Sequence, residues 1–180
     1  MNNILKLTLI LCLICAITAG ILGGVNELTK DRIYAINNAA TVAAYSAVLE
    51  ADRYEALDFD AAAFPTVDKV SRASGDIGYV VELTVSGAQG LITLAVGVDN
   101  DDTCTGISII SHSETSGLGA NAAADSEIGR NFRAQFVGQG EGIALSKNGG
   151  EIEGLSGATI TSNAVTGAVA TAIQVVKSLG

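Results

Sequence analysis

The sequence contains few side chains that bind metals or form disulfides. Its 180 residues include three cysteines and one histidine. Cys12 and Cys15 lie in an apolar N-terminal run, so Cys104 is alone in the rest of the chain and no internal disulfide can form there. The single histidine, His112, excludes a multi-histidine metal centre and a haem with two histidine ligands. We therefore expect no metal site.

Basic residues are also scarce. The chain has nineteen Asp and Glu against ten Lys and Arg, a formal net charge of −9, and Lys6 is the only charged residue before Glu27. The acidic part that follows would repel both a phosphate backbone and an anionic lipid surface. We expect no nucleic acid among the partners.

Motifs of common catalytic sites are missing as well. The sequence has no G-x-S-x-G nucleophile elbow, no Walker A motif and no Rossmann glycine pattern between a strand and a helix. His112 has no Asp and Ser arranged around it as a triad would need. We therefore expect no catalytic acid, base or nucleophile in this chain.

The N-terminus carries the longest apolar run. Leu7–Val25 is nineteen residues without a charge, enough for a helix to cross roughly 30 Å of hydrocarbon. A cleaved signal peptide is the alternative, but its apolar region would be shorter and end in an A-x-A-like site. We expect residues 1–26 to be a retained transmembrane anchor. Ala16, Gly20 and Gly24 share one face of this helix, a pattern typical of packing against other membrane subunits.

The rest of the chain divides into a stalk and a folded domain. Residues 27–69 read as an Ala-rich stalk helix to about Leu57 and a linker with Pro65, and residues 70–180 read as one domain. Residues 78–85, 91–98 and 104–111 are β-rich and are joined by short turns, which predicts an antiparallel meander.

Helices are expected after these strands. Residues 120–136 read as a helix broken near Gly129, and residues 161–179 read as a closing helix. Between them, edge strands at 142–146 and 151–153 would flank the turn Asn148-Gly149-Gly150. The order predicts an α+β fold: one N-terminal transmembrane helix, then a mostly antiparallel sheet with flanking helices.

Two short segments carry the functional signal. Ser156-Gly157-Ala158-Thr159 stands at the start of the closing helix, where unpaired N–H groups and partial positive charge accept phosphate. A plain helix cap is the structural alternative, because Ser and Thr are preferred at that position. The second segment, directly after the third strand, is Ser111-His112-Ser113-Glu114-Thr115-Ser116-Gly117-Leu118-Gly119.

Together these segments resemble the motifs of the FMN-binding domain family. With one N-terminal span ahead of them, they are most similar to the G subunit of the Rnf ion-translocating electron transport complex. The family's loop usually reads E-T-P-G-L-G, and Ser116 stands here in place of the proline. The family pattern before S-G-A-T usually begins with Asp, and here that residue is Glu153.

The resemblance implies a covalently bound FMN. A Mg²⁺-dependent flavin transferase would link the FMN phosphate to the Thr159 hydroxyl, beside Ser156, Gly157 and Ala158. Thr115 and Leu118 are similar to family residues that touch the isoalloxazine ring. By the same likeness, Glu114, Gly117 and Gly119 would shape that loop.

The resemblance also implies a role as the redox subunit of an ion-translocating oxidoreductase. The chain would pass electrons within a membrane complex that couples electron transfer from ferredoxin to NAD⁺ to the translocation of Na⁺ or H⁺. Its domain would lie on the extracytoplasmic side of the cell membrane, although Lys6 before the span and Lys30 and Arg32 after it do not favour an inside N-terminus. The alternatives are a non-redox anchored assembly or ligand-binding subunit, and the flavin-carrying C subunit of a sodium-pumping NADH:quinone reductase.

Overall fold

The computed structural model describes residues 3–179, with side-chain surroundings for residues 5–27, 29–30 and 39–179. It forms two compact units, Met1–Ala40 and Thr41–Gly180. Helix α1 runs from Asn3 to Val48. Within it, Leu5–Glu27 has a mean hydropathy of 2.4 and no buried residues, so this stretch is long and apolar enough to cross a membrane.

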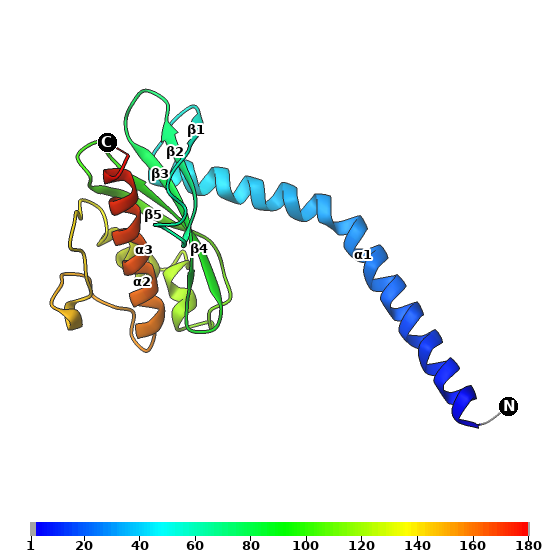
Figure 1. Cartoon of the computed structure of the whole chain (residues 1–180). Coiled ribbons are helices and arrows are strands. Elements are labelled where there is room, and N and C mark those ends of the chain that lie inside the picture. Colours follow the sequence, from blue (N-terminus) through cyan, green and yellow to red (C-terminus); the bar gives the residue numbers. More distant parts are fainter. Residues whose placement is uncertain (1–2, 180) are drawn as a thin grey trace. The chain divides into compact units, whose positions relative to one another are not determined.

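The second unit contains an antiparallel sheet. Its strands are β1 (Tyr54–Leu57), β2 (Val67–Ala73), β3 (Tyr79–Ser86), β4 (Leu91–Val98) and β5 (Cys104–His112). Each strand pairs with the next, in the spatial order β1-β2-β3-β4-β5 (Figure 1). Short connections allow such a meander. The α+β fold class is therefore confirmed.

Four helical segments follow the sheet in the sequence. They are η1 (Gly119–Ala122), α2 (Glu127–Ala134), η2 (Ser146–Asn148) and α3 (Thr159–Lys177). Helix α3 lies along one face of the sheet (Figure 1). Apolar side chains of β3, β4 and α3 are buried between them, among them Val81, Leu83, Leu94, Val96, Val165, Ala168 and Val169. This core fixes where the N-terminus of α3 lies.

The opposite face of the sheet covers the end of α1. Ala44, Tyr45 and Val48 pack there against Val80 and Ala95. The Thr105 hydroxyl donates a 2.6 Å hydrogen bond to the carbonyl of Val48, one of the last helix carbonyls, which have no partner inside the helix. A Cβ on Gly97 would lie 2.6 Å from that carbonyl oxygen, so glycine provides the space for this helix end.

Two expectations about the N-terminal half were wrong. The stalk helix was expected to reach about Leu57, but α1 ends at Val48 and Tyr54–Leu57 is strand β1. Strand β2 was not expected, and it pairs with both β1 and β3. The side chains of residues 31–38, within the expected stalk helix, lie outside those that the structure describes.

Two local expectations in the C-terminal half were also wrong. Residues 120–136 do contain two helical pieces, η1 and α2, but the break lies at residues 123–126 and Gly129 is inside α2. The hairpin around Asn148-Gly149-Gly150 is absent from the described residues 142–153, where a single parallel bridge joins Leu145 to Ile152. A Cβ on Gly150 would lie 2.7 Å from Ala144 Cα, so the chain folds back too tightly for two paired strands.

Candidate functional site

The loop after β5 is a hydrogen-bonded turn. The carbonyl of Thr115 accepts the N–H groups of Leu118 and Ala120, each at 3.2 Å. Gly117 adopts a φ of +79°, a conformation that side chains disfavour, and its carbonyl accepts the Asn121 amide at 3.0 Å. The loop therefore has a defined shape with serine in place of proline, and it presents exposed Thr115 and Leu118.

The His112 side chain supports this loop by accepting a hydrogen bond from the loop's backbone. Its Nδ1 accepts the backbone N–H of Glu114 at 3.2 Å, and its side chain is otherwise exposed at the end of β5. Within the described residues, its imidazole forms no ion pair or side-chain hydrogen bond with a carboxylate. The geometry is that of a turn residue, because the imidazole nitrogen serves as a local backbone acceptor.

The carboxylate of Glu114 is buried and fully engaged. Oε2 accepts the Thr161 hydroxyl of α3 at 2.5 Å, and Oε1 accepts the backbone N–H of Gln89 at 3.0 Å. Burial raises the pKa of Glu114, but hydrogen bonds from Thr161 and from the amides of residues 88–90 outweigh it and hold the pKa below its ordinary value. The group is thus an ionised carboxylate held by the protein's own donors.

The segment before α3 is closed by Ser162. The Ser162 Oγ accepts the backbone N–H of Leu155 and donates to the carbonyl of Ala158, both at 2.9 Å. The N–H of Ala158 returns a 3.0 Å bond to the carbonyl of Leu155, and Gly157 within this turn has a φ of +71°. A glycine in the third position of such a turn is the standard requirement. Ser156-Gly157 is therefore held as a rigid turn at the mouth of the helix.

Side chains further away fix the approach to this turn. Gln135, the C-cap residue of α2, bonds both backbone groups of Glu153: its Oε1 accepts the N–H at 2.7 Å and its Nε2 donates to the carbonyl at 3.2 Å. The Glu153 side chain itself is exposed. Only the backbone of residue 153 takes part in these hydrogen bonds, so Asp and Glu could make them equally well at this position.

The hydroxyl groups around the turn fall into two sets. Thr161, Ser162 and Thr166 are buried, and each hydroxyl makes a hydrogen bond. Ser156 and Thr159 are exposed, and neither side chain has a hydrogen bond among the described residues. Helix α3 begins at Thr159 with Ala158 as its N-cap, and no side chain caps it. The interpretation of Ser156 to Thr159 as a plain helix cap is therefore wrong.

The two sequence motifs meet at Gly157 and Leu118. A Cβ on Gly157 would lie 3.0 Å from Leu118 Cδ2, so the leucine side chain rests on the glycine backbone. Leu118 is 43% exposed, and Ile160 next to Thr159 is 60% exposed. An apolar surface thus borders a free threonine hydroxyl at a helix N-terminus, where a phosphate charge is favoured.

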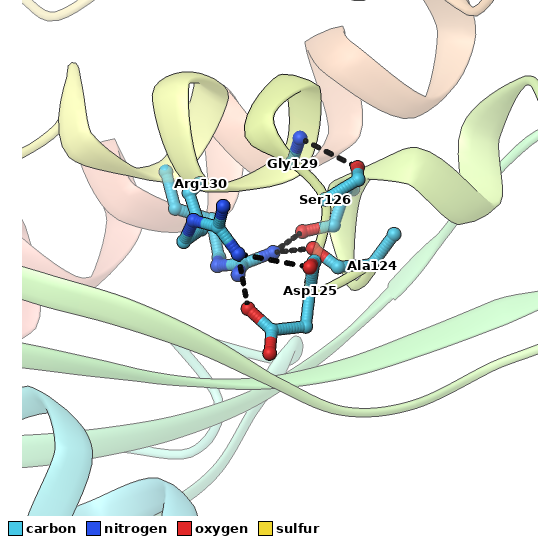
Figure 2. A network of polar contacts seen from close by, with 7 residues as sticks. Ala124, Asp125, Ser126, Gly129 and Arg130 are labelled. Atoms are coloured by element: carbon cyan, nitrogen blue, oxygen red, sulfur yellow. Dashed lines mark hydrogen bonds and ion pairs between the residues drawn. The ribbon is translucent and has the colours of Figure 1, made fainter.

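Helix α2 anchors the far end of the loop. Ser126 caps it by accepting the Gly129 N–H at 3.2 Å, and Arg130 donates to Asp125, as Figure 2 shows. Arg133 donates to the carbonyls of Ala122 and Ala124 at 2.7 and 3.0 Å. A Cβ on Gly129 would lie 2.5 Å from the carbonyl oxygen of Asn121, so glycine permits this close packing.

The sequence had not indicated all of the site. Both motifs were found from the sequence, but the β3–β4 turn at residues 86–90 was expected to be a plain connection, and Thr161 and Ser162 ordinary helix residues. Two adjacent hydroxyl residues at the start of an apolar helix are the signal that could have drawn attention to them, since buried hydroxyls need partners.

The fold and these two motifs define a flavin-binding domain preceded by a helix able to span a membrane. Residues 87–174, which contain both motifs, match the family model of the FMN-binding domain. Residues 1–48 match the model of the RnfG N-terminal region.

Individual relatives agree with these matches. The chain is 32% identical to the G subunit of the Na⁺-translocating ferredoxin:NAD⁺ oxidoreductase complex of Acetobacterium woodii, over 98% of this chain and 93% of that protein. It is 34% identical to the proton-translocating counterpart of Clostridium ljungdahlii, over 98% and 94%. It is 40% identical to the G subunit of an ion-translocating oxidoreductase complex of Methanosarcina acetivorans, over 61% of this chain but only 56% of that longer protein. The chain belongs to the family of G subunits of Rnf-type ion-translocating oxidoreductase complexes.

Proposed function

We propose that this chain is a membrane-anchored electron-transfer subunit that carries FMN covalently on Thr159. The relatives that it matches over nearly their full length are named as subunits of Na⁺- and proton-translocating ferredoxin:NAD⁺ oxidoreductase complexes. Its place would be in a complex of that kind, coupling ferredoxin:NAD⁺ electron transfer to movement of Na⁺ or H⁺. When bound, the flavin supplies the redox chemistry, and the protein supplies binding and orientation.

The state of the Thr159 hydroxyl is the observation that supports this proposal most. It is exposed at the first residue of α3 and makes no hydrogen bond among the described residues, whereas the hydroxyls of Thr161, Ser162 and Thr166 are buried and bonded. A modifying enzyme can reach only an exposed group. Of Thr159, Thr161 and Thr166 in α3, Thr159 is thus the one whose hydroxyl is exposed for attachment of the flavin.

The surrounding residues fit a phosphodiester. Such a group keeps one negative charge, which the unpaired N–H groups and partial positive charge at the N-terminus of α3 favour. Gly157 is exposed at this turn, and exposed Leu118 beside it offers an apolar surface to an aromatic ring. Thr115 lies in the same loop as Leu118, and we assign both to the ring contact.

The attachment reaction balances with FAD as donor. Thr159 Oγ1 forms a bond to the phosphorus of the FMN half, the P–O bond of the pyrophosphate breaks, AMP leaves, and the hydroxyl proton is released. A separate Mg²⁺-dependent flavin transferase would catalyse this step. No residue of this chain is needed as catalyst, and no oxidation or reduction occurs in it.

The membrane arrangement is part of the proposal. We assign residues 1–26 to a single transmembrane anchor, 27–69 to the connection and 70–180 to the FMN-binding domain, whose sheet is completed by β1 and by the first residues of β2 from the connection. The domain would lie on the extracytoplasmic side of the cell membrane, among other membrane subunits of the complex. A covalent bond suits this place, because a dissociated flavin could not be replaced from the cytoplasmic pool.

In-gel fluorescence tests the attachment site. The full chain is made in a host that has a flavin transferase, denatured, separated and viewed under ultraviolet light. Wild type and Thr159→Ser should fluoresce, and Thr159→Val should be dark. Thr171→Val is the matched control, since Thr171 is a threonine of the same helix whose hydroxyl bonds the Gly167 carbonyl at 2.9 Å. Undiminished fluorescence in Thr159→Val would refute the attachment.

A further inference from the structure

The Glu114 carboxylate joins three segments that are distant in the sequence. Oε1 accepts a hydrogen bond from Gln89 in the β3–β4 turn, and Oε2 accepts one from Thr161 in α3. Glu114 itself begins the loop that carries Thr115 and Leu118. The residue is only 9% exposed, and each carboxylate oxygen accepts a hydrogen bond from the chain, so the partners of this carboxylate are groups of the protein.

Two glycines make room for this carboxylate. A Cβ on Gly87 would collide with Oε1 and would lie 2.7 Å from Ile92 Cδ1. A Cβ on Gly119 would collide with Oε2 and would lie 2.5 Å from the Thr161 hydroxyl oxygen. Neither glycine has a positive φ, so a side chain at either position would act by displacing the carboxylate and not by straining the backbone.

We infer that Glu114 is a positioning residue that binds no part of the FMN. Its carboxylate holds the loop Thr115–Gly119 against the first turn of α3 and against the β3–β4 turn at residues 86–90. We call these three segments, joined by Glu114, the frame. The inference rests on the proposed function for the flavin, but the frame itself is a property of the chain alone. The loop's Leu118 contacts Gly157, two residues before Thr159. A small displacement of the loop would therefore change the surface on which the ring packs.

The hydroxyl of Thr161 is the part of this frame that can be removed with least change of shape. Thr161→Val keeps the branched side chain and removes the donor to Oε2. Thr166→Val is the matched control, since Thr166 is also buried in α3 but its hydroxyl bonds the Ser162 carbonyl at 2.8 Å. Both variants lose one buried hydroxyl, and only the first loosens the frame.

Hydrogen exchange of the full chain in detergent, made without a flavin transferase, tests the frame alone. Thr161→Val should raise exchange of residues 86–90 and 115–119 by about tenfold or more, as expected for loss of a hydrogen bond to a charged group. Thr166→Val should leave both segments at the wild-type rate. Wild-type exchange of both segments in Thr161→Val would overturn the inference.

Visible circular dichroism of the flavin-loaded chain tests the consequence for the cofactor. Thr161→Val should keep the covalent flavin, because Thr159 is intact, but should lose most of the dichroism that fixed surroundings induce. Gly87→Ala should do the same from the β3–β4 turn, whereas Gly140→Ala, with no atom closer than 4.0 Å to the added Cβ, should not. Unchanged dichroism in Thr161→Val and Gly87→Ala would overturn the inference. A wild-type chain without flavin would refute only the proposed function, since the exchange measurement would still decide on the frame.

Discussion

Ser162→Ala offers a quantitative test of the turn that presents Thr159. The Ser162 Oγ accepts the N–H of Leu155 and donates to the carbonyl of Ala158. After the substitution the Ala158 carbonyl still accepts the backbone N–H of residue 162, at 2.9 Å in the wild type. Only the Leu155 N–H is left without a partner, and that residue is buried.

The magnitude follows from this one unpaired donor. A buried donor without a partner costs about 1–3 kcal/mol, so the free energy of unfolding should fall by that amount. With a urea dependence of roughly 2 kcal/mol per molar, the midpoint of unfolding should fall by about 1 M. The methyl group that remains fits the space, so no cavity penalty adds to this value.

Urea unfolding of the full chain in detergent provides the assay. The chain has no tryptophan, and Tyr45, Tyr54 and Tyr79 of the second unit report unfolding through tyrosine emission. Ser156→Ala is the control, because that exposed side chain makes no hydrogen bond and should change stability by less than about 0.5 kcal/mol. Equal midpoints for Ser162→Ala and Ser156→Ala would refute the reasoning about the turn.

Three further predictions concern charge, core and thiol chemistry. Folding lowers the pKa of Glu114, so the stabilisation from its ionised carboxylate is complete above the ordinary glutamate pKa of about 4.3 and is lost as the pH falls through the lower folded pKa. Glu114→Gln should therefore unfold at lower urea concentration than wild type at pH 7. If the difference between the two urea midpoints did not narrow at acidic pH, this prediction would be contradicted. Phe136 is fully buried, and Phe136→Ala should cost about 3–5 kcal/mol in the same urea assay, a prediction that a wild-type midpoint would refute. Burial raises the pKa of Cys104 to about 12 and shields its thiol. In a variant with Cys12 and Cys15 replaced by Ser, so that only Cys104 can react, iodoacetamide should label the chain only after unfolding. Rapid labelling of the folded chain would refute this.

The central strands could be predicted from the sequence because alternation and turn residues agree there. Residues 91–98 form β4 with the bounds expected, and the neighbouring strands differ by one residue or so. Strand β2 was missed because Asp68, Lys69 and Arg72 are interspersed among its buried residues, so it shows no clear alternation of apolar and polar residues. Strand β1 is only four residues long and follows an Ala-rich helix, so local propensity favoured continuing that helix.

The site could be predicted in its motifs but not in its frame. The two hydroxyl- and glycine-bearing loops are visible in the sequence because their residue types are unusual together. The contact of Glu114 with residues 88–90 and Thr161 depends on how the β3–β4 turn and α3 meet in space, which spacing along the chain does not reveal. Glycines misled the prediction in two places, since Gly129 and Gly150 serve close packing and not a break or a hairpin.

Mass spectrometry of the C-terminal peptide tests the central claim most directly. The full chain is made in a host with a flavin transferase and digested, and the peptide that contains Ser156 and Thr159 is fragmented. The account predicts the added mass of FMN less one water, located on Thr159. An unmodified peptide, or flavin located on Ser156, would contradict it.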